Sequence, residues 1–441
     1  MKVTISEIYP HLGQARRVRF QVEPDHHDVV YNEKLRGKLN LRDVDIDLLG
    51  GVRVDRIHPD LLGLAALLLV APMSKRKIEL NIPVSEGFKQ CAASSGLIQV
   101  HAPVDLSLAR RAFPTRPRPG LAFSGGVDSC AALLLMSPET VPVFLHRRRP
   151  CASGPSNYND SAALFSCGKA LEAGYDLQCI GTSLEFVRKP VGNPVDWSNS
   201  APAIVNADAL SLDSISFGMI AESAYWTGGP HFSDLKTRPR FAAWAPVFEY
   251  CGVPISLPTA ALSEVLTYKI CATSGQHLAP QSCVRGTPSN PCMRCFKCFR
   301  KGLVEAALRR AEPDAEILAN LLPRSEVAGK LLEVPIHHEI VIAWALNRCR
   351  NPDHEFLRRL AAKLRVVCDF GGSLAFLERY YSKGLEYTVS AQRAGVEQKI
   401  RTFCDPMTPE DEVHLEHWMA EPLTSSQSYR EGQESLRAVL E

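Results

Sequence analysis

Hydrophobic and polar residues follow different patterns in successive parts of this chain. In the first hundred residues, Val18–Val22 and Lys77–Ile82 alternate apolar and polar side chains, as half-buried strands do. Between them, the apolar run Leu61–Val70 follows Pro59-Asp60 and predicts a short buried helix. We therefore expect an α+β region at the N-terminus.

The middle of the chain alternates short apolar runs with longer stretches of helical character. The runs predict four strands, at Leu121–Phe123, at Val141–Leu145, at Leu177–Thr182 and around Ile215. Helices are expected between them, at Ser129–Met136, Tyr158–Ala173 and Ala201–Leu210. Strands that alternate with helices are typical of a parallel α/β sheet, in which ligands bind beyond the carboxyl ends of the strands.

From Phe299 onward, apolar residues recur at helical spacing. The predicted helices are Glu305–Ala311, Ile336–Asn347, Glu355–Cys368 and Ser373–Tyr381. The final segment, Thr424–Glu441, is polar, and we expect it to be partly mobile. The last third of the chain is therefore expected to be a helical region.

A proline- and arginine-rich segment at residues 110–120 reads as an extended connector. A boundary there divides the chain into an N-terminal α+β domain (residues 1–117), a central α/β domain (118–302) and a helical C-terminal region (303–441). A chain of 441 residues is long enough for two or three domains.

Composition narrows the class of protein. The net charge of +2 creates no global field that would concentrate nucleic acid or membranes, so RNA contact rests only on the basic connector and on Arg147–Arg149. The longest apolar stretch, Leu61–Pro72, is too short to span a bilayer, and the chain does not begin like a signal peptide. We therefore expect a cytoplasmic protein whose 14 cysteines are reduced.

The motif richest in chemical information is Ser124-Gly125-Gly126-Val127-Asp128-Ser129, directly after an apolar run that ends at Phe123. Its glycines let the backbone approach a phosphate, and the helix that follows adds a favourable partial charge. Asp128 is placed to hold a magnesium ion against that phosphate. The Gly-Lys-Ser/Thr ending of a Walker loop is absent.

Four cysteines form a second motif, Cys283-x8-Cys292-x2-Cys295-x2-Cys298. Thiolates at this spacing can close around one metal ion, and a set of four cysteines is typical of structural zinc. Four thiolates can also bind an iron–sulfur cluster, so that alternative stays open. A redox Cys-x-x-Cys motif would use only two of the four cysteines.

The glycine motif resembles the PP-loop of the ATP pyrophosphatases, and the two motifs together resemble the 7-cyano-7-deazaguanine synthase (QueC) family over residues 118–302. The resemblance implies an adenine-nucleotide alpha hydrolase-like, Rossmann-like parallel sheet with a zinc knuckle. It implies that the enzyme uses ATP, Mg2+ and Zn2+. The residues that would act in catalysis are Ser124, Asp128 and Ser129. Nucleotide contacts would come from these three and from Phe123, Gly125, Gly126 and His146.

Further segments follow in the order of that family. Gly218 and Glu222, after the strand at Ile215, and Arg238 in Arg238-Pro239-Arg240-Phe241 are implied to lie near the second substrate, a deazaguanine on which a tryptophan ring could stack. The chain departs from the family at Ser263, because no lysine stands beside it. The role of that lysine is therefore unassigned in this chain.

The resemblance implies an ATP-dependent carbon–nitrogen ligase. It would adenylate the carboxylate of 7-carboxy-7-deazaguanine and form an amide or nitrile with ammonia or with a protein amine, releasing AMP and pyrophosphate. QueC-like proteins with extra regions also occur in anti-phage defence operons, which keeps a protein acceptor open. Two alternatives stay open as well: a tRNA-modifying PP-loop ligase or thiolase, and a module that senses nucleotide or base without turnover.

Overall fold

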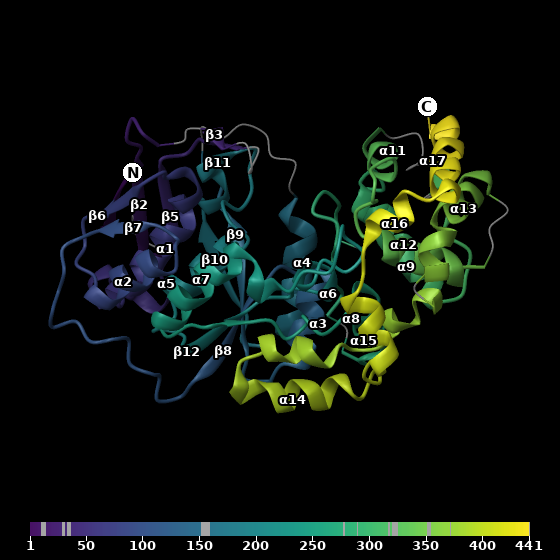
Figure 1. Cartoon of the computed structure of the whole chain (residues 1–441). Helices are drawn as coiled ribbons and strands as arrows, with labels where there is room; N and C mark the ends of the chain where they lie inside the picture. Colours follow the sequence, from purple (N-terminus) through teal and green to yellow (C-terminus); the bar gives the residue numbers. More distant parts are fainter. Residues whose placement is uncertain are drawn as a thin grey trace.

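The computed structural model describes residues 1–9, 15–28, 31–32, 37–150, 159–276, 278–288, 290–315, 318–319, 325–350, 354–370 and 372–440. A ten-stranded sheet occupies the N-terminal and central parts, and helices make up the C-terminal part (Figure 1). The strands lie in the order β13-β12-β8-β9-β10-β5-β2-β1-β6-β7. Most neighbouring strands are parallel, so the expectation of a mixed α/β fold with a large parallel sheet is confirmed.

One half of the sheet, from the edge strand β13 to β10, is entirely parallel. It consists of β8 (Arg118–Phe123), β9 (Val141–Arg147), β10 (Gln178–Thr182), β12 (Leu212–Ser216) and β13 (Ile255–Ser256). Counted along the chain, these five strands lie in the order 3-2-1-4-5. The order reverses beside β8, and such a switch point is where open α/β sheets bind ligands.

The N-terminal strands extend the same sheet. They are β1 (Lys2–Ile8), β2 (Arg17–Glu23), β5 (Asp43–Asp47), β6 (Lys77–Leu80) and β7 (Gln99–His101). β5 pairs with β10 in antiparallel fashion, with Ile46 opposite Thr182, so the sheet runs across the boundary placed at residue 117. A small second sheet contains β3 (Tyr31–Asn32), β4 (Gly37–Leu39) and β11 (Arg188–Lys189).

Helices cover this sheet. They are α1 (Pro59–Val70), α2 (Glu86–Ser94), α3 (Val127–Leu135), α4 (Asp160–Glu172), α5 (Ala201–Val205), α6 (Ala221–Ala224), α7 (Pro239–Tyr250) and α8 (Glu264–Thr273). The helix expected at residues 158–173 thus begins at Asp160, and Tyr158 lies outside the described residues. The helix expected at residues 201–210 is shorter and ends at Val205.

The C-terminal helices are α9 (Phe296–Leu308), α11 (Ser325–Leu331), α12 (Glu339–Arg348), α13 (Glu355–Phe370), α14 (Ser390–Ile400), α15 (Pro409–Glu416), α16 (Ala420–Thr424) and α17 (Gln427–Leu440). α9 spans the boundary placed at residue 302. α14 packs against α3, where Lys399 donates to the carbonyl oxygen of Leu134 at 3.1 Å. The C-terminal region is therefore joined to the central sheet through α3.

The expectation of a mobile C-terminal segment is wrong, because α17 packs along α13 (Figure 1). Tyr429 and Leu436 are buried, and a Cβ on Gly432 would lie 2.5 Å from the Cα of Lys363. The polar composition reflects the outer face of a docked amphipathic helix. The helix expected at residues 373–381 is a 3-10 helix, Gly372–Glu378.

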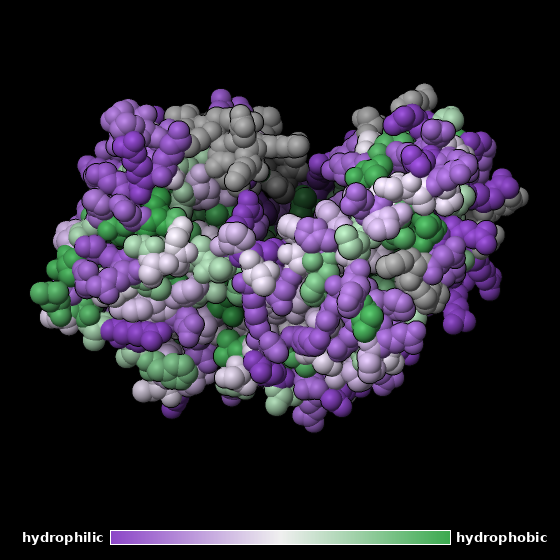
Figure 2. Space-filling model, in the orientation of Figure 1, coloured by the Kyte–Doolittle hydropathy of each residue, from purple (hydrophilic) through white to green (hydrophobic). Residues whose placement is uncertain are grey.

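Further short 3-10 helices connect these elements, at Leu49–Gly51, Val54–Arg56, Ala71–Met73, Leu184–Val187, Ser198–Ser200, Leu235–Thr237 and Ser382–Tyr387. The face drawn in Figure 2 is largely hydrophilic and is hollowed between the N-terminal half and the C-terminal helices. Within the described ranges, no helix combines the length and the apolar character needed to cross a membrane.

Candidate nucleotide site and metal centre

The glycine loop follows β8 directly, at the carboxyl end of the first strand of the parallel set. Gly125 has a φ of 72°, a left-handed conformation that strains any residue with a Cβ. A Cβ there would lie 3.1 Å from the Cβ of Ser166 and 3.2 Å from the carbonyl oxygen of Ala163, both in α4. Gly125 therefore allows both the turn and the close approach of the loop to α4.

Two serines fix the shape of the loop. The Ser129 hydroxyl donates to the carbonyl oxygen of Gly126 at 3.1 Å and accepts the backbone N–H of Ser124 at 3.3 Å. The two hydroxyl oxygens lie 3.0 Å apart. Because Ser129 is buried and Ser124 is exposed, Ser129 shapes the loop and Ser124 is the hydroxyl that a ligand can reach.

A cavity of about 190 Å³ opens beside this loop. Among the residues expected to contact a nucleotide, Phe123, Ser124 and Gly126 line it. Gly125 and Ser129 are buried behind the loop, and His146 does not line the cavity. His146 lies on β9 next to Phe144, with 6.5 Å between their ring centroids.

Asp128, in the first turn of α3, is held by two groups from distant parts of the chain. The Thr267 hydroxyl donates to its Oδ1 at 2.8 Å, and the Lys301 Nζ lies 3.9 Å from the same oxygen. The Asp128 side chain keeps 32% of its exposure. It is therefore a positioned carboxylate beside the loop that remains accessible from outside.

A buried charge cluster connects Asp128 to the C-terminal region. Glu264 is fully buried, and its carboxylate lies 3.0 Å from both Arg300 and Lys301 and 3.5 Å from His338. Burial acts to raise the pKa of Glu264, but the charges of Lys301 and Arg300 outweigh it and hold the pKa below its ordinary value. Burial, together with Arg300, lowers the pKa of His338 to about 3, which leaves the imidazole neutral.

Glu222 lies next to this cluster. Both of its carboxylate oxygens lie 3.1 Å from the Glu264 backbone nitrogen, whose N–H they accept. Burial, followed by the charge of Glu264, raises the pKa of Glu222 to about 8, so the group carries a proton at neutral pH. Glu222 also lines a second cavity of about 370 Å³, together with Trp226 and His338.

The other two expected substrate residues serve different contacts. A Cβ on Gly218 would lie 2.7 Å from the carbonyl carbon and oxygen of Asp128, so Gly218 lets this strand end pack on the start of α3. Arg238 lines neither of these two cavities. Its guanidinium lies 4.6 Å from the ring centroid of Trp226 and donates to the carbonyl oxygen of Ser233 at 2.8 Å. Arg238 therefore supports a wall residue of the second cavity.

The two tryptophans that flank Trp226 in the sequence, Trp197 and Trp244, are buried. Trp197 and Trp244 each have only 3% of their surface exposed, and Trp197 packs edge-on against Phe217 with ring centroids 4.9 Å apart. Trp226 is 40% exposed and is the tryptophan available for stacking.

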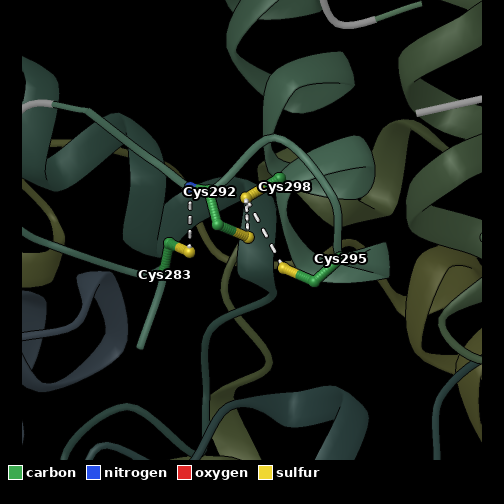
Figure 3. A group of neighbouring side chains, drawn as sticks. All are labelled: Cys283, Cys292, Cys295 and Cys298. Atoms are coloured by element: carbon green, nitrogen blue, oxygen red, sulfur yellow. Dashed lines mark hydrogen bonds between the residues drawn. The ribbon is translucent and has the colours of Figure 1, made fainter. Parts of the chain in front are cut away.

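The four cysteines meet as their spacing predicts. Their sulfur atoms lie within 4.8 Å of one another and point toward a common centre (Figure 3). The Sγ of Cys298 lies 3.5 Å from that of Cys295 and 3.9 Å from that of Cys292. Thiolates around one tetrahedral zinc stand roughly 3.8 Å apart, given Zn–S bonds of about 2.3 Å. The cluster can therefore bind a metal such as zinc, and its spacing suits one ion better than a cluster of several atoms.

Several of the arginines considered for RNA contact are engaged within the protein. Arg147 is paired with Asp160 at 2.9 Å and with Glu185, and Arg148 is paired with Asp47. In the connector, Arg111 donates to Asp208 at 2.7 Å and to two backbone carbonyl oxygens, and Arg110 donates to two more. These contacts fix the connector to the central sheet.

Sequence reasoning missed the cations that surround the loop. Lys297, Arg300 and Lys301 all lie on α9, which begins at the last cysteines of the cluster. Lys297 lines the cavity beside the loop, whereas the other two bind Glu264. Their spacing of three and four residues, which places side chains on one helix face, was the available signal. Arg300 and Lys301 thus supply positive charge at Glu264, directly after Ser263, where the chain has no lysine.

Comparison with known proteins found one family model that matches part of the chain. Residues 243–419 are similar to a family of unknown function (DUF6395). The matched segment includes the four cysteines, α9 and most of the C-terminal helices, but begins after the glycine loop. No curated protein and no solved structure matches the chain.

Proposed function

We propose that this protein is a QueC-like, PP-loop ATP-dependent ligase with an adenine-nucleotide alpha hydrolase-like central sheet. The observation that carries the proposal is the Ser-Gly-Gly-x-Asp-Ser loop, which leaves the first strand of a 3-2-1-4-5 parallel set and opens on a cavity. A loop of this kind at a topological switch point is suited to bind phosphates through backbone N–H groups and a helix N-terminus.

The reaction would proceed in two steps. A carboxylate oxygen of the second substrate attacks the α-phosphorus of ATP, the bond to the β-phosphate breaks, and pyrophosphate leaves. An amine then attacks the acyl carbon, a proton leaves the amine nitrogen, and AMP departs with the carboxylate oxygen it received. The loop N–H groups and the Ser124 hydroxyl would stabilise the negative charge on the phosphates.

Metal ions would have separate roles in this scheme. Asp128 fits a magnesium ligand, because it is a carboxylate at the start of α3 that is fixed by Thr267 and still accessible. Magnesium would neutralise charge on the leaving pyrophosphate. Zinc in the four-cysteine cluster would be structural, since all four ligands are protein thiolates.

The second cavity is the proposed site of the carboxylate substrate, a 7-carboxy-7-deazaguanine. Glu222, protonated at neutral pH, could donate a hydrogen bond there, and the exposed Trp226 offers an aromatic face for a planar base. Arg238 would act through Trp226. Ammonia or a protein amine would be the acceptor, and the regions outside residues 118–302 would serve a large acceptor, as in a defence system.

Nucleotide product analysis tests the proposal. Purified protein is incubated with ATP, magnesium and 7-carboxy-7-deazaguanine, with and without ammonium. We expect AMP and pyrophosphate only when the deazaguanine is present, and an amide of the base in the product mass spectrum. Asp128→Asn should abolish both products, whereas Asp176→Asn, remote in sequence and exposed, should not. ATP left intact in every mixture would contradict the proposal.

A further inference from the structure

Lys297 lies inside the metal-binding motif, between Cys295 and Cys298, in the first turn of α9. Its side chain is exposed and lines the same cavity as Ser124 and Gly126. The metal-binding segment therefore contributes a cation to the space that the glycine loop faces.

The other charges around this cavity are already balanced. Arg147 is held by Asp160 at 2.9 Å, and it neutralises Glu185, the acidic residue of the cavity wall. On α9 itself, Arg300 and Lys301 are both bound to Glu264 at 3.0 Å.

Lys297 differs from these groups. Within the described ranges it forms no hydrogen bond or ion pair, and the charges of Lys301 and Asp128 act on it without direct contact. A cation that faces a confined space with no anion in direct contact is suited to bind an anion from solution.

The wall formed by the glycine loop also favours an anion. The loop presents its backbone there, and α3, a nine-residue helix, begins at the same place. Its N-terminus carries a positive partial charge and free N–H groups. Two independent features, the helix start and an unpaired lysine from another element, thus face one cavity of about 190 Å³.

We infer that Lys297 binds the phosphate chain of the nucleotide in this cavity, together with the glycine loop. This inference rests on the proposed function and adds a substrate-contacting residue to it. Because Lys297 lies between two cysteines of the cluster, a bound metal would also fix the position of a residue that holds substrate. The four-cysteine cluster would then be part of the nucleotide site as well as a structural element.

The test is calorimetric titration of the metal-loaded full-length protein with ATP and, separately, with pyrophosphate. Lys297→Gln should weaken binding of both by about 10-fold or more, as expected for loss of a hydrogen bond between charged groups. Lys297→Arg keeps the charge and should stay within a few-fold of the wild type. Lys269→Gln, in a separate cavity with Arg379 and Arg401, should bind as the wild type does.

Metal content and thermal midpoint, measured on each variant, separate lost binding from lost structure. Equal ATP affinity for Lys297→Gln and the wild type would overturn the inference and leave the proposed function standing. A wild-type protein that binds neither ATP nor pyrophosphate would overturn the proposed function and the inference with it. Weakened binding together with loss of metal in both Lys297 variants would also overturn the inference, because the lysine would then act through the cluster.

Discussion

The backbone N–H of Gln281 donates a hydrogen bond to the carbonyl oxygen of Gly125, with 2.7 Å between the nitrogen and the oxygen. Gln281 lies two residues before Cys283, and both residues line the cavity beside the glycine loop. The segment that leads into the four-cysteine cluster therefore supports the loop directly. A change in the conformation of the cluster should therefore alter the conformation of the loop, although the two motifs are far apart in sequence.

Removal of a metal ion held by the four cysteines should loosen the glycine loop. Cys292→Ser, or treatment with a strong chelator, should lower the free energy of unfolding by about 3 kcal/mol or more, because a site of this kind forms only in the folded state. Hydrogen exchange should increase in peptides that contain Gly125. Cys179→Ser, an exposed cysteine outside the cluster, is the matched control and should change neither quantity. Unchanged exchange at the loop after metal loss would contradict this prediction.

Gly125→Ala should be costly for two reasons, and a second glycine separates them. Gly96 has a φ of 74°, close to that of Gly125, but a Cβ there would meet no atom within 4 Å. Gly96→Ala should therefore cost only the backbone strain, about 1 kcal/mol. Gly125→Ala should cost at least about 1 kcal/mol more, because of contact with Ser166 and Ala163. Urea unfolding measures the loss of stability in both variants. Equal losses would mean that α4 moves away from the added methyl group without cost.

Stability should depend on pH through Glu222. Its pKa is about 8 in the folded protein and about 4.5 when unperturbed. Below pH 4.5 both states are protonated, and the stabilising contribution is complete. Between 4.5 and 8 the unfolded chain releases the proton while the folded protein keeps it, so this contribution is lost as pH rises through the window.

In the Glu222→Gln variant the side chain cannot ionise, so comparison with the wild type isolates the contribution of Glu222 to the pH dependence of stability. Its free energy of unfolding relative to the wild type should rise between pH 5 and pH 8, by at most about 1.4 kcal/mol per pH unit. Urea unfolding at pH 5, 6.5 and 8 measures the trend. The exposed Glu249→Gln should give a difference that is flat with pH. A flat difference for Glu222→Gln would show that the folded protein ionises this group normally.

Lys301 should matter for stability far more than a lysine in a surface ion pair. Lys301→Met leaves Glu264 and Asp128 with less compensating charge and should cost about 3–5 kcal/mol, as for a broken buried ion pair. Lys301→Arg should recover part of that loss. Lys169→Met removes the exposed pair with Glu172 and should cost at most about 1 kcal/mol. Similar midpoints in denaturant for the two methionine variants would contradict this account.

Contiguous features were predictable from the sequence because short-range geometry fixes them. The run from Phe123 to Ser129 has to turn at its glycines and start a helix, and the loop and α3 lie where that pattern predicts. Cysteines separated by two residues can face one point at a helix start, and the four sulfur atoms do meet. The α/β alternation likewise predicted a mostly parallel sheet.

Only the tertiary structure decided which distant residues share a site. Glu264 meets Lys301 and His338, and Asp128 meets Thr267, because folded helices bring their faces together. Packing also docks α17, whose polar sequence suggested mobility, through a face that buries Tyr429. The spacing of residues along the chain determines local hydrogen bonding and helical or strand periodicity. Which distant charges form ion pairs depends instead on how the folded elements pack and bury them. The loop and the cysteine set were therefore determined by sequence, and the charge cluster around them by the fold.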